Sequence, residues 1–279
     1  MLKINIICSD NGWIYSKFIS MFYRFSKHQI FVNSKEQCDV VHYLPYQEKL
    51  DNDRHPCTVY LSHQDQDEDR FIYAVQTADF SISMSRKYMC AAVSYGVGNI
   101  IQIVPGVDFQ KFRLRTEKRL NKNKLIVGYI GKQFNAEERK NPKLLQKIVS
   151  LPFVDLKISG GLIKEHDLPQ FYSSLDIIIS PALNESGPMA LIEGLAVGTP
   201  FLCFDGVGMA NEFDEGVIKV PFADEEAFIK RLEEFWDNSE ELKFRKYELM
   251  SKLREQVTCF TWEDFVVKHD KVWEELKGV

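Results

Sequence analysis

The feature that most constrains the fold is an alternation of short apolar runs and helix-patterned segments, which occurs twice along the chain. In the first series the apolar runs of strand length are KINIIC, QIFV, DVVHYL, TVYLSH, DFSISM and NIIQIV. Segments with apolar residues at helical spacing lie between them, at residues 13–27, near 70–77 and at 85–95. Alternating β and α elements predict a parallel sheet covered by helices. We therefore predict an N-terminal α/β domain over residues 1–112.

A basic stretch separates the two series. Residues 113–124 hold six basic residues against one acidic residue and show no apolar periodicity, which is typical of a linker. The alternation then restarts with KLIVGYIG, VDLKISGG, DIIIS, PFLCF and GVIKV, which predicts a second α/β domain over residues 125–260. A last helix within residues 261–279 has apolar side chains at helical spacing. We expect it to pack back toward the N-terminal domain.

Composition excludes several classes of protein. With 45% hydrophobic and 27% charged residues the chain is neither disordered nor fibrous, and 35 basic against 40 acidic residues argue against a nucleic-acid partner. The apolar stretch at the N-terminus is too short for a signal peptide, and no run of about eighteen apolar residues occurs. The six cysteines form no C-x-x-C pair, which indicates reduced thiols. We expect a cytoplasmic protein that does not span a membrane.

The stretch NESGPMALIEGLAVGTP, residues 184–200, places a carboxylate inside an apolar helix. The glycine and proline at 187–188 read as the N-cap and first helical residue, and Gly198 reads as the stop, so the helix is predicted over 188–197. Glu193 is the one charged residue in this helix. A buried carboxylate without partners is costly, so Glu193 is expected to have a hydrogen-bond or ionic donor.

Two interpretations of this carboxylate stay open on the residues alone. One is a core salt bridge or a carboxylate at the open edge of the sheet. The other starts from the helix N-terminus, which follows the strand DIIIS and forms an anion site where ligands of parallel sheets bind. Glu185 in the loop and Glu193 about two turns into the helix would then flank one ligand. A carboxylate accepts from two vicinal hydroxyls at once, which suits a ribose or another sugar.

In this setting the chain resembles the retaining glycosyltransferases of family 4. That family has the GT-B fold, in which two Rossmann-like domains with parallel sheets face each other and a C-terminal helix crosses back. The similar stretches, in family order, are VPGVDFQKF, IVGYIGK, ERKN, LKISGG, FYSSLDIIISPALNESGPMALIEGLAVGTPFLC and FTWEDF. The two glutamates with seven residues between them are a fairly specific part of the pattern. The resemblance covers roughly residues 57–275 and is dense from 100 to 205.

The resemblance implies roles for the helix and its two carboxylates. Glu193 would bind the nucleotide ribose, and Glu185 would bind the transferred sugar. Backbone amides at the start of the helix would lie near the phosphate and the sugar, and the donor-binding residues expected there are Gly187, Pro188, Met189 and Ala190.

Further residues match the family's pattern outside that helix. Lys132 and Lys140 would neutralise the diphosphate, and Arg139 is equally placed to do so, although each could instead be a solvated loop residue. Lys132 stands where the family usually has arginine. His63 falls where the first domain of the family has a histidine that reaches the sugar, against the alternative of a structural strand-end histidine. Gly12 in SDNGW is the one glycine that remains of the family's glycine-rich loop.

The resemblance implies a retaining, metal-independent glycosyltransferase that needs no cofactor. It would move a sugar, expected to be a hexose, from a nucleoside diphosphate sugar to the hydroxyl of a glycan, lipid-linked or small-molecule acceptor. Two alternatives are kept, a catalytically silent sugar-nucleotide-binding protein on the same fold and a nucleotide-sugar epimerase. Asn141 stands where the family usually has glycine, and the first domain is shorter than usual. The nucleotide base, the acceptor, the linkage and the oligomeric state are left open.

Two competing interpretations concern the first domain. Asp65 and Asp67 form an Asp-x-Asp sequence that could hold a divalent cation, although an acidic start to the following helix is the favoured interpretation. The helix at residues 13–27 combines an apolar side with a basic side, which would suit peripheral contact with a membrane that carries a lipid-linked acceptor. Ordinary packing of its apolar face on the sheet is favoured instead.

Overall fold

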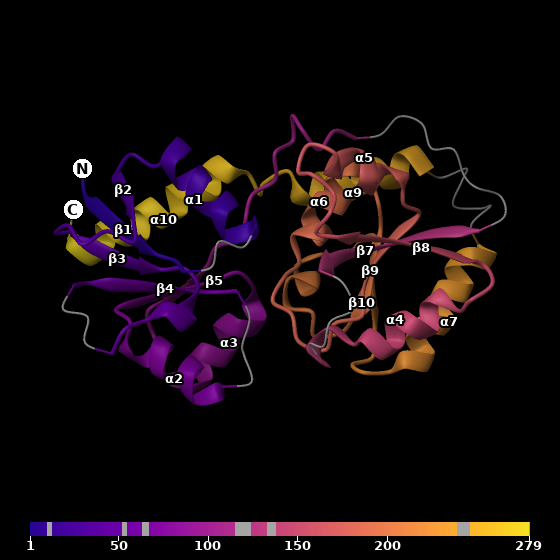
Figure 1. Ribbon diagram of the computed structural model, residues 1–279, viewed down its shortest axis with the longest axis horizontal. Coiled ribbons are helices and arrows are strands. Elements are labelled where there is room, and N and C mark those ends of the chain that lie inside the picture. Colours follow the sequence, from indigo (N-terminus) through magenta and orange to yellow (C-terminus); the bar gives the residue numbers. More distant parts are fainter. Residues whose placement is uncertain are drawn as a thin grey trace. The chain divides into compact units, whose positions relative to one another are not determined.

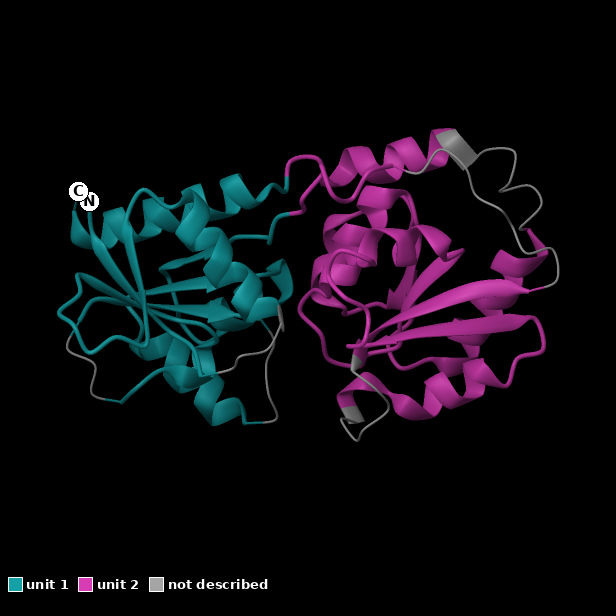
Figure 2. Cartoon of the chain, turned by 45° about the horizontal axis from the view of Figure 1, so that its top comes forward, with its two compact units in different colours: residues 1–106, 260–279 teal, residues 107–259 magenta. Residues whose placement is uncertain are grey.

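The chain folds into two compact units, which are coloured separately in Figure 2. Unit 1 comprises residues 1–106 and 260–279, and unit 2 comprises residues 107–259. The computed structural model describes residues 1–9, 13–51, 55–62, 67–114, 124–132, 138–238 and 246–278. Most of the predicted linker at 113–124 lies outside the described residues.

Unit 1 is built on a six-stranded sheet in which all neighbouring strands run parallel. The strand order is β2-β1-β3-β4-β5-β6. The strands are β1 (Lys3–Ile7), β2 (Gln29–Val32), β3 (Val40–Tyr43), β4 (Cys57–Leu61), β5 (Phe80–Ser83) and β6 (Ile100–Gln102). All five residues of β4 are buried, as expected of a central strand covered on both faces.

Helices cover both faces of this sheet (Figure 1). On one side α2 (Glu68–Thr77) and α3 (Arg86–Ser94) pack on the strands and form an apolar core with them. On the other side α1 (Trp13–Phe25) lies beside α10 (Trp262–Lys277), so the two ends of the chain meet in one unit. The prediction that the C-terminal helix packs back toward the N-terminal region is confirmed.

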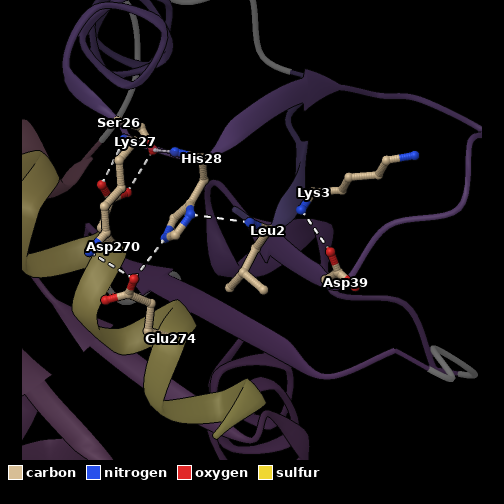
Figure 3. Close-up of polar contacts among 8 residues, drawn as sticks. All are labelled: Leu2, Lys3, Ser26, Lys27, His28, Asp39, Asp270 and Glu274. Carbon is tan, nitrogen blue, oxygen red and sulfur yellow. Dashed lines mark hydrogen bonds and ion pairs between the residues drawn. The ribbon is translucent and has the colours of Figure 1, made fainter. Parts of the chain in front are cut away.

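Polar contacts fasten α10 to the end of α1 (Figure 3). The carboxylate of Asp270 accepts from the Ser26 hydroxyl at 2.7 Å and from the Lys27 backbone N–H at 3.1 Å. Glu274 forms an ion pair with the Lys27 ammonium at 2.7 Å, which raises the pKa of Lys27 and lowers that of Glu274. His28 accepts from the Leu2 N–H through Nδ1 at 3.3 Å. The helix is therefore held by directed bonds as well as by apolar packing.

The apolar side of α1 faces inward. Phe18 and Phe22 are both fully buried, and the Phe18 ring lies 5.6 Å from the rings of Tyr60 and Trp262. Because α10 and the sheet cover these side chains, the structure favours ordinary packing of this helix over contact with a membrane. Within the described residues, no helix is both long enough and apolar enough to cross a membrane.

Unit 2 repeats the architecture with five parallel strands in the order β11-β10-β9-β7-β8. They are β7 (Leu125–Lys132), β8 (Val154–Gly160), β9 (Ile177–Ser180), β10 (Phe201–Phe204) and β11 (Val217–Val220). The helices are α4 (Pro142–Val149), α5 (Leu168–Ser174), α6 (Met189–Val197), α7 (Glu225–Asp237) and α9 (Lys246–Val257). In Figure 1, α4 and α7 lie on one side of the sheet, and α5, α6 and α9 lie on the other.

Helix α6 is buried along its whole length and has the expected limits, except at its first residue. Every residue from Met189 to Val197 is buried. Pro188 is the N-cap in extended conformation rather than the first helical residue, so the predicted start is one residue early. Gly198 ends the helix with φ at 83°, a left-handed conformation that glycine adopts without strain.

Candidate functional site

The strand order of unit 2 has a switch point between two particular strands. The chain goes from β7 to β8 on one side and then to β9 on the other, so β7 and β9 are neighbours at which the winding direction reverses. In such sheets ligands bind beyond the carboxyl ends of the strands at this switch point. The segments that follow β7 and β9 there contain Arg139, Lys140, Glu185 and the start of α6.

These two segments bring a carboxylate against two cations. The short helix η2 (Glu138–Lys140) ends with Arg139 and Lys140. The Lys140 ammonium is bonded to Glu185 Oε2, and Arg139 Nη1 lies 3.4 Å from the same oxygen. The side chain of Glu185 is 13% exposed, whereas those of Arg139 and Lys140 are 28% and 34% exposed. The three residues predicted to bind the diphosphate and the sugar therefore form one charged cluster at the sheet edge.

Backbone hydrogen bonds fix the loop that carries Glu185. Leu183 donates its N–H to the carbonyl of Arg139 at 2.7 Å, which joins the loop after β9 to η2. On its other side the loop is bonded to the short helix η3 (Gly208–Glu212), because the Gly208 N–H donates to the Glu185 carbonyl at 3.0 Å. The Met209 N–H likewise donates to the Ser186 carbonyl. Glu185 therefore sits on a backbone held from both sides.

Helix η3 is a part of the site that sequence reasoning missed. A Cβ atom on Gly187 would lie 2.6 Å from the Cβ of Met209, so the turn before α6 can pack on η3 only with glycine at this position. The signal was present in the sequence as Gly206 and Gly208, which directly follow the strand PFLCF at the same sheet edge.

Glu193 lies deeper than the charged cluster, inside α6, and is fully buried. The phenol of Tyr172, on α5, donates to Glu193 Oε2 at 2.8 Å. Burial and the Glu193 charge raise the pKa of Tyr172 well above its ordinary value, so the phenol keeps its proton and remains a donor. The expectation that Glu193 has a donor is thus met by a neutral tyrosine.

The start of α6 faces the same loop. Met189 and Ala190 form its first turn and are buried, and Pro188 provides no side-chain cap for the helix. The first backbone N–H groups of a helix have no partner within the helix and carry its positive dipole end. The segment 187–190, where the phosphate contacts are predicted, therefore carries a positive dipole end that favours an anion.

Asn141, where the resemblance implies a glycine, has a left-handed backbone conformation with φ at 50°. Its side chain accepts from the Leu144 N–H at 3.2 Å and so caps α4 immediately after Lys140. Asparagine tolerates this conformation better than most residues with a side chain. The departure from glycine thus keeps the backbone geometry and adds a cap.

Several predicted residues lie outside this part of the structure. Gly12, His63 and Asp65 are not among the described residues. Lys132 is the last residue of β7, and its side chain is likewise outside the description. Asp67 is the N-cap of α2 and accepts from the Arg70 N–H at 2.9 Å, in keeping with the interpretation of this acidic stretch as a helix start.

Comparison with known proteins identifies the family pattern. The model of the family Glycosyl transferases group 1 matches residues 114–252, which include all the described residues of the candidate site in unit 2. No curated protein matches the chain by sequence.

Solved structures match over both units. Sucrose-phosphate synthase from Thermosynechococcus elongatus superposes with a TM-score of 0.79 at 16% identity, with 100% of each chain covered. HepE from Anabaena in complex with UDP-glucose gives 0.73 at 11% identity, again with 100% of each chain covered. A glycosyltransferase from Rickettsia africae gives 0.71 at 11% identity, with 99% of this chain and 98% of that chain covered. The predicted GT-B fold is confirmed.

Proposed function

Since the chain belongs to the family Glycosyl transferases group 1 and is a glycosyltransferase, we propose that it transfers a hexose from a UDP-sugar to a hydroxyl acceptor with retention of anomeric configuration. The observation that carries this proposal is the cluster of Glu185, Arg139 and Lys140 at the switch point of unit 2. HepE, which has the same fold, was solved with UDP-glucose bound, so UDP-glucose is the donor to test first.

The two cations and the helix start would bind the diphosphate. Arg139 and Lys140 both form ion pairs with Glu185. A bound diphosphate would offer these cations further anionic partners, with the first amides of α6 beside them. Negative charge grows on the diphosphate as the glycosidic bond breaks, so fixed positive groups at this place stabilise the transition state. We propose that Lys132, at the end of β7, is a third cation for the diphosphate.

The two carboxylates would bind hydroxyl groups. Glu185, on the loop, would accept from hydroxyls of the transferred sugar, and Glu193 would accept from the ribose diol. No described side chain of the site is an obvious nucleophile. Attack by the acceptor hydroxyl on the face that the diphosphate leaves, with the hydroxyl proton passing to the departing diphosphate, would retain the configuration.

We propose in addition that the reaction needs no divalent metal. The cations and the helix start already supply positive charge to the diphosphate, and Asp67 is engaged as a helix cap. Donor turnover in excess chelator should equal turnover without it. Complete loss of turnover that manganese restores would contradict this part of the proposal.

The proposal is tested with Glu193→Gln, which keeps the side-chain shape and removes its charge. Hydrogen bonds to charged groups contribute about 1.5–3 kcal/mol, so UDP affinity should fall about tenfold or more. The free energy of unfolding should change little, because a buried charge is removed together with its desolvation cost. Titration calorimetry with UDP and chemical denaturation measure the two effects.

Glu226→Gln is the matched control, because Glu226 is exposed on α7 of the same unit. It should leave UDP affinity unchanged. A large loss of stability with intact UDP affinity in Glu193→Gln would show that the Glu193 carboxylate serves the core instead of the nucleotide. UDP-glucose bound by the wild type without any product would identify a silent binding protein, and a freed sugar isomer would identify an epimerase.

A further inference from the structure

A buried tyrosine connects the site to the segment through which the chain enters unit 2. Tyr172 lies on α5, is fully buried, and donates to Glu193 Oε2 at 2.8 Å. A carboxylate oxygen that accepts from a confined phenol is restricted in its orientation, so this bond can orient the whole group. Neither the helix pattern nor the sequence motif pointed to this residue.

The position of Tyr172 is itself fixed on both sides. Thr199 follows Gly198, the C-cap of α6. Its hydroxyl donates to the Tyr172 carbonyl at 3.0 Å. The Phe112 ring packs against the Tyr172 ring with a centroid separation of 5.9 Å and an interplanar angle of 51°. Phe112 is also fully buried, so the tyrosine ring is confined by protein rather than by solvent.

Arg254 holds Phe112 and α6 together. On α9, its Nη1 donates to the carbonyls of Phe112 and Ala196, each at 2.6 Å, and Ala196 is in the last turn of α6. Its Nη2 donates to the Phe109 carbonyl at 3.3 Å, and its guanidinium carbon lies 5.0 Å from the centre of the Phe109 ring. One guanidinium thus ties the segment 109–112 to the helix that carries Glu193.

We propose that Tyr172 is a positioning residue of the donor site, which orients the Glu193 carboxylate for the nucleotide while Phe112 and Arg254 keep the phenol in place. The inference rests on the proposed function, because it takes Glu193 as the residue that binds the ribose. Pre-orientation of a binding group raises affinity by reducing the ordering cost of binding. Tyr172 would thus act on the donor through Glu193.

The test is Tyr172→Phe, which removes the phenol oxygen and keeps the ring against Phe112. The Kd for UDP, measured by titration calorimetry, should rise about threefold to tenfold, since the Glu193 carboxylate is no longer pre-oriented and ordering it adds to the cost of binding. The KM for UDP-glucose should rise by the same factor while kcat stays nearly constant, because binding is weakened equally before and in the transition state. A purely structural role would not move the donor KM in this selective way.

Tyr60→Phe is the matched control. Tyr60 is also fully buried, and its phenol donates to the Ile103 carbonyl at 3.3 Å, but it lies in the core of unit 1. The two variants lose the same atom from a buried site. Tyr60→Phe should leave the UDP Kd and the donor KM at wild-type values.

A double variant isolates the coupling between the two residues. In the Glu193→Gln background, Tyr172→Phe should change the UDP Kd less than twofold, because the group that Tyr172 orients no longer carries its charge. Phe112→Leu provides a second route to the same result, with a UDP Kd about twofold to threefold above wild type. If Tyr172→Phe and Phe112→Leu both bind UDP like Tyr60→Phe, the positioning role is overturned. If wild type binds no UDP, the proposed UDP-sugar function fails first, and that outcome is recognisable before any variant is compared.

Discussion

The two units bury titratable side chains in different places. In unit 1, His42 on β3 and His269 on α10 lie in the middle of an aromatic core, with ring centroids 5.5 Å apart. In unit 2, the buried Glu193 and the largely buried Glu185 lie on segments that follow the carboxyl end of β9. Burial alone therefore does not identify a functional site, whereas the carboxyl ends of strands beside a switch point are where ligands of such sheets bind.

His42 and His269 are neutral parts of the core of unit 1. Burial lowers the pKa of His269 to about 3 and lowers that of His42 well below its ordinary value. His269 Nδ1 donates to the Phe265 carbonyl at 2.8 Å, and His42 Nδ1 lies 2.7 Å from the Thr58 hydroxyl. The Nε2 atoms of both rings are buried and have no hydrogen-bond partner among the described residues. Such groups contribute to folding by packing, and they become costly when they must carry charge.

The largest change in the free energy of unfolding is expected for a substitution in α10. It tests whether this helix stabilises unit 1 rather than contributing to the donor site. Trp273 is fully buried and packs on Phe22 and His42, with ring centroids 5.4 Å and 5.5 Å away. Trp273→Ala should lower the free energy of unfolding by about 3–5 kcal/mol, the usual cost of removing a large core side chain. Chemical denaturation measures this loss, and UDP affinity of the folded variant should stay at its wild-type value.

Val267→Ala is the control on the same helix, because Val267 is 39% exposed. It should cost less than about 0.5 kcal/mol, as surface substitutions usually do. If Trp273→Ala is as stable as Val267→Ala, the claim that α10 stabilises unit 1 through Trp273 is wrong. A loss of UDP affinity at unchanged stability would instead assign α10 to the site.

The fold could be predicted from the sequence because its signals are local. Apolar runs of strand length alternate with helical spacing, and Gly198 ends α6 where a glycine was needed. The charged cluster could be predicted in part, because Glu185, Arg139 and Lys140 match a family pattern. Tyr172 and η3 could not, since their contacts with Glu193 and Gly187 join residues that are far apart in the sequence and have no fixed spacing. The histidine core of unit 1 escaped prediction for the same reason.

The second-largest expected effect is on the pH dependence of the unfolding free energy, through His269 in unit 1. In the unfolded chain His269 takes up a proton near its ordinary pKa of 6.5, whereas in the fold its pKa is about 3. Its contribution is therefore fully present above about pH 6.5 and is lost as the pH falls toward 3, at about 1.4 kcal/mol for each pH unit. Between pH 6 and pH 4.5, His269→Gln should lose about 2 kcal/mol less unfolding free energy than wild type does. Chemical denaturation at several pH values provides both slopes.

The test compares how the free energy of unfolding changes with pH in the variant and in the wild type. Burial raises the pKa of the neighbouring Asp270, so its protonation acts in the opposite sense and stabilises the fold as the pH falls. His166→Gln is the control, because the His166 side chain is 74% exposed, and it should keep the wild-type slope. If the unfolding free energy of His269→Gln has the same pH dependence as that of the wild type, the pKa of His269 is not lowered by the fold. The claim that this histidine is a neutral part of the core would then be wrong.

The smallest expected effect concerns Asn141, where unit 2 uses a left-handed backbone conformation next to Lys140. Asn141→Gly removes the side-chain cap on α4 but relieves the strain at a φ of 50°, so the free energy of unfolding should change by less than about 0.5 kcal/mol. Asn141→Ala loses the cap and keeps the strain, and it should cost about 2 kcal/mol. Chemical denaturation of both variants separates the two contributions. If glycine costs as much as alanine, the side-chain bonds to the Leu144 N–H and to Glu225 fix this corner of the site. If glycine is neutral, the backbone conformation is what the position requires, and the side-chain bonds are dispensable.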